Sequence, residues 1–185
     1  MLETRIATTQ AEKEAVFRSR YAIYVEEMGR YQATADHANK MLSDPEDDWS
    51  WIVYTTDGTD VVASTRMTWG GHCFSDRQIA QYGLAPFLAE LPPETMLVGE
   101  RTMISPSWRG IDLFSVLTEG MDGLAQRHGV RVVFGACEPH LLSFYCRYQR
   151  TYAPRNINSA EGGYLIPLIS FLPDVDALAG LGGQP

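Results

Sequence analysis

One segment of the chain decides the fold, and it reads Ile104-Ser-Pro-Ser-Trp-Arg-Gly-Ile-Asp-Leu-Phe-Ser-Val-Leu117. The pattern predicts the end of a strand, a proline-marked turn, an Arg-Gly corner and an amphipathic helix. The first N–H groups of such a helix lack partners within it, and the helix dipole favours an anion there. Arg109 adds a charged, forked donor. The segment therefore predicts a site for a phosphorylated carrier.

The composition is that of one globular domain. The chain has 185 residues, of which 45% are hydrophobic and 21% charged, so it is long enough for a sizeable core. We expect a single domain over residues 1–172 and a flexible tail over residues 173–185, which ends in Gly-Leu-Gly-Gly-Gln-Pro. The net charge of −8 argues against nucleic acid as a partner.

The sequence carries no membrane or metal signal. It has no run of about 18 apolar residues, so no membrane span is expected. It also lacks a basic N-terminal stretch followed by an apolar one, which argues against secretion. Cys73, Cys137, Cys146 and the four histidines do not have the spacing of metal ligands. These patterns predict a cytoplasmic protein that binds no metal.

Hydrophobic periodicity predicts alternating strands and helices. We expect strands at 4–8, 51–56, 61–68, 97–104, 131–136 and 164–169, and helices at 9–28, 112–128 and 139–148. Within 77–90 we expect a short helix that is interrupted by Gly83 and Pro86. Residues 30–48 show no clear period, contain the acidic run Asp44-Pro-Glu-Asp-Asp48, and are interpreted as a mobile loop or lid. The order of elements predicts a mixed α/β fold with one main sheet.

This order, with a Pro-x-x-Arg-Gly turn before the main helix, resembles the GNAT superfamily of acyl-CoA-dependent N-acyltransferases over roughly residues 4–170. The resemblance implies a mixed, mostly antiparallel central sheet with a V-shaped splay, flanked by helices. It equates the family's pyrophosphate turn, Arg/Gln-x-x-Gly-x-Gly/Ala, with Arg109-Gly-Ile-Asp-Leu-Phe114. The implied donor contacts are Ile104, Arg109, Gly110, Ile111, Asp112 and Leu113.

The turn departs from the family pattern at two positions. Asp112 and Phe114 stand where the pattern has glycines, which allow a backbone to approach a pyrophosphate closely. A single phosphate, as on the phosphopantetheine of an acyl carrier protein, fits such a turn more easily. The resemblance then narrows to the acyl-homoserine lactone synthases and the related long-chain N-acyl amino acid synthases.

The same resemblance assigns the residues that would bind the acceptor. It matches Arg20-Tyr-Ala-Ile-Tyr24 in the first helix, an acidic pair among Asp44, Asp47 and Asp48, and an arginine on each of two strands. The implied substrate contacts are Arg20, Tyr24, Asp48, Arg66, Arg101 and Glu138. Arginines would suit a carboxylate and the acids an ammonium group. A solvated acidic loop is the alternative.

Two residues are candidates for proton transfer. The late segment Glu138-Pro-His-Leu-Leu-Ser-Phe-Tyr-Cys-Arg-Tyr148 is similar to the family's late helix, which implies that Tyr145 protonates the departing thiolate. Its alternative is a core aromatic beside Phe144. Glu100 could deprotonate the attacking ammonium if burial raises its pKa. Its alternatives are a salt bridge with Arg101 or Arg66, with Glu138 as the base.

The sequence therefore predicts an enzyme, an N-acyltransferase. It would move a medium or long acyl group from acyl-CoA or acyl-phosphopantetheine to a primary amine, such as an amino acid or a peptide amine, by direct attack. An acyl carrier protein is a possible partner. A small-group N-acetyltransferase using acetyl-CoA and a non-catalytic acyl-thioester-binding module remain open.

Overall fold

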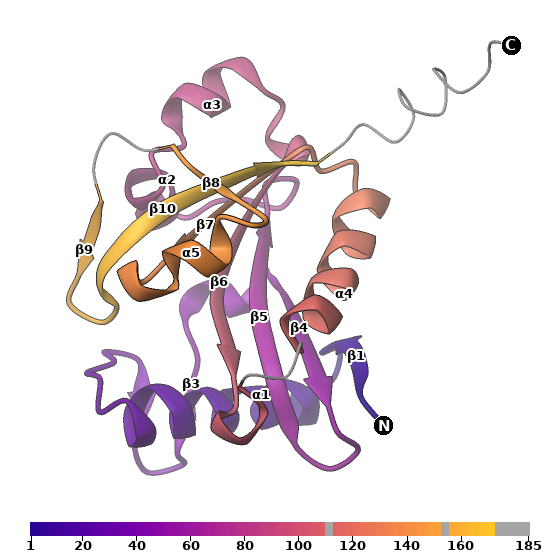
Figure 1. The fold of residues 1–185 in the computed structure, drawn as a ribbon, viewed down its shortest axis with the longest axis vertical. Coiled ribbons are helices and arrows are strands. Elements are labelled where there is room, and N and C mark those ends of the chain that lie inside the picture. Colours follow the sequence, from indigo (N-terminus) through magenta and orange to yellow (C-terminus); the bar gives the residue numbers. More distant parts are fainter. Residues whose placement is uncertain (110–112, 153–155, 173–185) are drawn as a thin grey trace, which may run out of the picture.

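The computed structural model describes residues 1–109, 113–152 and 156–172. Its main sheet has the strand order β1-β4-β5-β6-β7-β10-β8, and β9 pairs with the start of β10 (Figure 1). The strands are β1 (Glu3–Ile6), β4 (Trp51–Thr56), β5 (Val61–Trp69), β6 (Met96–Ile104), β7 (Val132–Cys137), β8 (Arg150–Thr151), β9 (Ile157–Ser159) and β10 (Gly163–Phe171). Within this order only β6 and β7 are parallel.

The parallel pair forms the predicted splay. β6 and β7 are in register only from Met96 to Val98 opposite Val132 to Phe134. β6 then continues beside β5 to Ile104, while β7 continues beside β10 to Cys137. In Figure 1 the two strands start together at the top and separate downward. The mostly antiparallel sheet with a V-shaped gap is confirmed.

A β-bulge in β6 lies beside the gap. Ser64 pairs with Met103 and Arg66 with Glu100, so Thr65 alone opposes two residues of β6. Of these two, Arg101 has a φ of 55°, a left-handed conformation that is uncommon for a residue with a side chain. Bulges bend a strand and redirect its side chains.

Helices cover both faces of the sheet. α1 (Gln10–Tyr21) begins at a Thr9–Glu12 capping box, and Val16 packs with Ile52 and Tyr54. α4 (Leu113–Arg127) packs on the opposite face, where Leu117 joins the core around Val53. Because successive strand residues point to opposite faces, Ile52 and Val53 separate the two layers.

The segment between β5 and β6 forms two short helices, and the interruption expected at Gly83 separates them. They are α2 (Asp76–Gln81) and α3 (Ala85–Glu90), and Gly83 between them has a φ of 59°. Tyr82 and Leu84 pack with Phe134 in a second part of the core. Three short 3-10 turns are η3 (Pro93–Thr95), η4 (Pro106–Trp108) and η5 (Pro139–Leu141). The turn η5 leads directly into the short helix α5 (Leu142–Tyr145).

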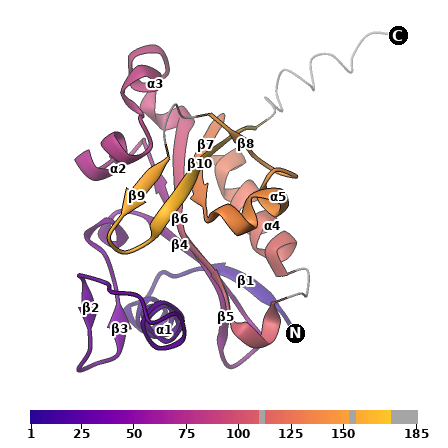
Figure 2. The same cartoon turned by 60° about the vertical axis from the view of Figure 1, so that its left-hand side comes forward.

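The stretch interpreted as a mobile loop is folded against α1. It forms the two-stranded sheet β2 (Ala35–Asp36) and β3 (Met41–Leu42), followed by the 3-10 turn η2 (Pro45–Asp48) (Figure 2). Leu42 is fully buried and Glu46 and Asp47 are almost so. Glu46 and Asp47 of the acidic run are therefore part of the interior, whereas Asp48 is exposed.

Within the described residues, no helix has the length and apolarity needed to cross a membrane. The predicted tail at 173–185 lies outside those residues.

Candidate functional site

The splay opens into a cavity of about 270 Å³. Its walls come from β5, β6, β7, β10, α4 and α5. They combine apolar side chains, among them Met67, Met121, Val133 and Phe134, with Gly99 and Gly135, which follow the last paired residues of β6 and β7 and so mark the apex of the splay. Carbonyl oxygens of one arm lie close to the Cα positions of the other. A Cβ on Gly135 would lie 3.6 Å from the carbonyl oxygen of Gly99. The two glycines leave the apex open.

Tyr145 lines this cavity at the end of α5. Its ring centroid is 5.4 Å from that of Phe114 and 5.5 Å from that of Phe144, both edge-on. Burial raises the pKa of Tyr145, and the nearby Tyr24, Cys137 and Glu138 add to this. The phenol therefore keeps its proton at neutral pH and can donate it.

The sequence-predicted phosphate contacts are only partly visible. Arg109 follows η4, and its Nε donates to the carbonyl oxygen of Ile104 at 3.1 Å. Its Nη1 and Nη2 donate to Oε1 and Oε2 of Glu27 at 2.5 and 2.9 Å. Leu113, the first residue of α4, is fully buried in the core. Gly110, Ile111 and Asp112 lie outside the described residues.

A buried charge cluster lies beside the splay. Arg20, which is 0% exposed, donates to Oδ1 and Oδ2 of Asp47 at 2.9 and 2.8 Å. Arg66, which is 1% exposed, donates to Asp44 Oδ2 at 2.6 Å and to Glu100 Oε2 at 2.9 Å. Arg20 and Arg66 thus pair with Asp47 and Asp44 of the acidic run. Burying charges is costly unless each has a partner, so these pairs specify one arrangement.

Arg101 extends the cluster toward the splay. Its Nε and Nη2 donate to Oδ2 and Oδ1 of Asp44, both at 2.7 Å, and Nη1 donates to Gln32 at 2.6 Å. Its guanidinium carbon lies 5.4 Å from the ring centroid of Tyr24. The Tyr24 hydroxyl is 3.5 Å from the carbonyl oxygen of Thr102 on β6. The bulge at Arg101 therefore brings the sheet, the first helix and the acidic run together.

Glu100 is paired on all sides. It accepts from Arg66, from Arg77 Nη1 at 2.9 Å and Nη2 at 3.0 Å, from Gln78 at 2.8 Å and from Tyr82 at 3.2 Å. Burial by itself raises the pKa of Glu100, but Arg66 and Arg77 outweigh burial and lower it to about 2. The expectation of a raised pKa was therefore wrong. The alternative of a salt bridge with Arg66 holds.

The remaining predicted substrate contacts are Glu138 and Asp48, which lie outside the buried charge cluster. Glu138, at the end of β7, pairs with Arg30 and lies near Tyr145. Asp48 is exposed at the end of η2, and Asp44 and Asp47 are the acids that bind the arginines. The predicted contact between Asp48 and an acceptor stays a prediction.

Several residues of the cluster carry no signal in the sequence. They come from distant segments and are Gln32, Arg77, Gln78, Tyr82 and Glu161. Only the Ser75-x-x-Gln78 capping box was detectable, because it marks the start of α2. Counted over the described residues and linked by contacts of 4.0 Å or less, the cluster has five carboxylates and four guanidinium groups. One negative charge is in excess.

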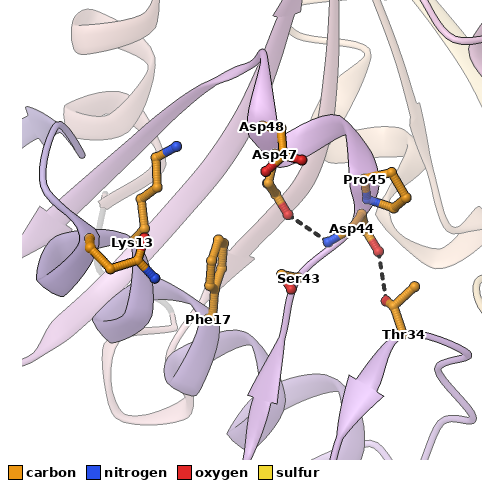
Figure 3. A pocket seen from close by; sticks show the side chains of 9 residues that line it. Lys13, Phe17, Thr34, Ser43, Asp44, Pro45, Asp47 and Asp48 are labelled. Atoms are coloured by element: carbon orange, nitrogen blue, oxygen red, sulfur yellow. Dashed lines mark hydrogen bonds between the residues drawn. The ribbon is translucent and has the colours of Figure 1, made fainter.

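A second, polar cavity of about 470 Å³ lies between α1 and η2. Figure 3 shows Lys13 and Phe17 of α1 on one side and Asp44, Asp47 and Asp48 on the other. Asp44 and Asp47 reach the arginines behind this wall. Among the described residues, the cavity therefore joins the buried cluster to solvent.

No family model matches the sequence, and no curated protein matches it. Solved structures do match. FeeM, an N-acyl amino acid synthase from uncultured soil microbes, has a TM-score of 0.72 at 13% identity, covering 98% of both chains. The acyl-homoserine lactone synthase LasI has a TM-score of 0.71 at 10% identity, covering 100% of this chain and 97% of its own.

A third match is BjaI, a CoA-dependent acyl-homoserine lactone synthase whose structure holds SAM and isopentyl-CoA. Its TM-score is 0.70 at 15% identity, covering 100% of this chain and 90% of its own. At these identities the likeness is one of fold. It confirms the mixed α/β, GNAT-like architecture over the length of the chain.

Proposed function

We propose that this protein is an N-acyltransferase that moves an acyl group longer than acetyl from a thioester to a primary amine. The observation that carries the proposal is the splay between β6 and β7, which opens into a cavity lined by Tyr145. A thioester placed between the strand arms would meet backbone groups at the apex and a protonated phenol at its edge. The structures of the same fold include enzymes named for N-acyl transfer.

The cavity has room for an acyl chain longer than acetyl. Its volume is about 270 Å³, and apolar side chains such as Met67, Met121 and Val133 line part of it. Burying each methylene group of a chain contributes about 0.8 kcal/mol, so a longer chain binds better there than an acetyl group.

The acceptor would be an amine that is protonated in solution. The excess negative charge of the cluster favours a cation, and Asp44 and Glu161 face Arg101 near the mouth of the splay. The arginines offer partners for a carboxylate on the same molecule. An amino acid has both groups. The donor would be acyl-CoA or the acyl-phosphopantetheine of a carrier protein.

Catalysis would follow direct attack within a ternary complex. The ammonium group of the acceptor first loses a proton, because only the free amine can attack the thioester carbonyl carbon. We assign this proton to Glu138, which is partly buried beside Tyr145, and assign Glu100 to holding Arg66 and Arg77. When the tetrahedral intermediate collapses, the C–S bond breaks and Tyr145 protonates the thiolate. The nitrogen, which still carries one proton more than an amide holds, gives that proton to the Tyr145 phenolate and restores the phenol. No covalent bond to the protein forms.

A graded set of donors tests the proposal. Acetyl-, butyryl-, octanoyl- and dodecanoyl-thioesters of CoA and of an acyl carrier protein are incubated with pooled amino acids, and free thiol is measured. We expect release with octanoyl donors and little with acetyl donors. Equal or faster release from acetyl-CoA would indicate a small-group N-acetyltransferase. Binding of octanoyl donors without release would indicate a non-catalytic acyl-thioester-binding module.

A further inference from the structure

The turn after α1 reaches across the chain to Arg109. α1 continues directly into a π-helical turn, η1 (Ala22–Glu27), a conformation that is rare and frequent at functional sites. This turn places Tyr24 against Arg101 and Glu27 against Arg109. Glu27 and Arg109 are 82 residues apart in sequence. The turn therefore connects Arg101, on the side proposed to bind the acceptor, with Arg109, the arginine predicted to bind the phosphate of the donor.

All three nitrogen atoms of the Arg109 guanidinium group have hydrogen-bond partners. Nε is held by the carbonyl oxygen of Ile104, and Nη1 and Nη2 face the two carboxylate oxygens of Glu27 in a fork-to-fork arrangement. The side chains are 44% and 34% exposed, so a ligand in solution can reach them. A carboxylate in this geometry takes the place that two phosphate oxygens would take.

A phosphate that binds Arg109 would have to displace Glu27 or lie beside it. Displacement removes a charged pair, and coexistence brings two like charges within a few ångströms. The cost of either grows with the number of negative charges on the donor. CoA carries a pyrophosphate and a further phosphate, whereas carrier-bound phosphopantetheine has one phosphodiester.

We propose that Glu27 sets donor selectivity by discriminating against polyanionic CoA esters in favour of donors with one phosphate or none. This inference rests on the proposed function, since it concerns the donor of that reaction. The role of Glu27 is a second reason to expect a carrier-bound donor, and it does not depend on the sequence of residues 110–112. Glu27 does not take part in bond making, and its effect acts through Arg109.

Three donors with the same acyl chain isolate the charge effect: octanoyl-CoA, S-octanoyl-4′-phosphopantetheine and S-octanoyl-pantetheine. The variant Glu27→Gln keeps an oxygen for Arg109 but loses the charge. The matched control is Glu26→Gln, a neighbour in η1 whose side chain pairs with Lys40 at 2.8 Å. Both variants remove one negative charge from the same turn.

For Glu27→Gln we expect kcat/KM for octanoyl-CoA to rise about fivefold at low ionic strength, with a smaller rise for the phosphopantetheine ester and none for the pantetheine ester. The control should leave all three unchanged. A change of equal size for all three donors, or no change for octanoyl-CoA, would overturn the inference.

Calorimetric titration of free CoA separates this inference from the proposed function. Glu27→Gln should bind CoA about fivefold tighter than the native chain, and the difference should shrink at high salt. If CoA binds in this pattern while no donor releases thiol, the selectivity stands and the acyltransferase proposal fails. If the two proteins bind CoA equally, or neither binds it, the role of Glu27 is refuted.

Discussion

Arg66 on β5 and Glu100 on β6 oppose each other in the sheet, and Nη2 of Arg66 donates to Oε2 of Glu100 at 2.9 Å. Arg77 of α2 binds both oxygens of the same carboxylate from the other side. With a pKa lowered to about 2, Glu100 is ionised at neutral pH. It links α2 to the sheet next to the splay.

The first prediction concerns which carboxylate accepts the proton. In Glu138→Gln, the acidic limb of the pH–rate profile should disappear and kcat should fall about 100-fold, because the base is gone. In Glu100→Gln, the shape of the profile should be kept, although the free energy of unfolding falls by about 3 kcal/mol as Arg66 and Arg77 lose their charge partner. Loss of the acidic limb in Glu100→Gln alone would reverse the two assignments.

The second prediction concerns stability in acid. The folded-state pKa of Glu100 is about 2 against 4.5 in the reference state, so its stabilisation is present above that reference value and is lost as pH falls toward 2. This linkage corresponds to about 3 kcal/mol. Arg101 and Arg66 also lower the pKa of Asp44 despite its burial, in the same direction.

Urea unfolding at a series of pH values measures this dependence. The free energy of unfolding should fall between about pH 5 and about pH 2, and the fall should be smaller in Glu100→Gln. Glu94→Gln is the control, since Glu94 is exposed in η3, and it should behave as the native chain. An identical pH dependence in Glu100→Gln and the native chain would refute the ion-pair account.

The third prediction concerns the departing thiolate. Tyr145→Phe keeps the ring contacts with Phe114 and Phe144 and removes only the hydroxyl. We expect kcat for octanoyl-CoA to fall about 100-fold with an unchanged melting temperature. The loss should be much smaller for a thiophenyl octanoate, whose thiolate needs no proton to leave.

Tyr148→Phe is the matched control for that experiment. Tyr148 contacts the same two rings but is 46% exposed, and its kcat should stay near that of the native chain. An equal loss of kcat for both thioesters in Tyr145→Phe would contradict the general-acid role.

The sequence predicted more of the fold than of the candidate site. The amphipathic helix after the Arg-Gly corner and the six predicted strands follow from local patterns, and the structure confirms them. The pairing of Arg101 with Asp44 and Gln32 depends on a bulge and on contacts 57 and 69 residues apart. Hydrophobic periodicity predicts neither the bulge nor these long-range contacts.

The error at Glu100 has a specific physical cause. Burial was expected to raise its pKa, which would be correct for an isolated carboxyl group. The sequence did not reveal that Arg77 and Gln78 of α2 would fold over it. The same limit applies to Glu27, whose partner Arg109 becomes visible only in three dimensions.

The fourth prediction concerns the apex of the splay. A Cβ on Gly135 would lie 3.6 Å from the Gly99 oxygen and 3.7 Å from Gln149, which are ordinary contacts. Gly135→Ala should therefore fold normally and Gly135→Val should narrow the apex. We expect KM for octanoyl donors to rise about tenfold in the valine variant and less in the alanine variant.

Gly123→Ala is the control for the cavity. A Cβ there would lie 3.5 Å from Arg127 on the same helix, and Gly123 does not line the cavity. KM should not change, while the melting temperature should rise slightly because alanine favours the helix. A normal KM in Gly135→Val would show that the thioester does not enter between β6 and β7.

The central claim is direct transfer from a thioester to an amine, and mass spectrometry of a single-turnover reaction tests it most directly. Octanoyl-CoA or octanoyl-carrier protein is mixed with excess enzyme and pooled amino acids, and thiol, N-octanoyl product and intact protein are measured together. We predict thiol release that requires an amine, one N-octanoyl product per thiol, and no acylated enzyme. Thiol release without an amine, or an acylated protein on the path to product, would contradict it.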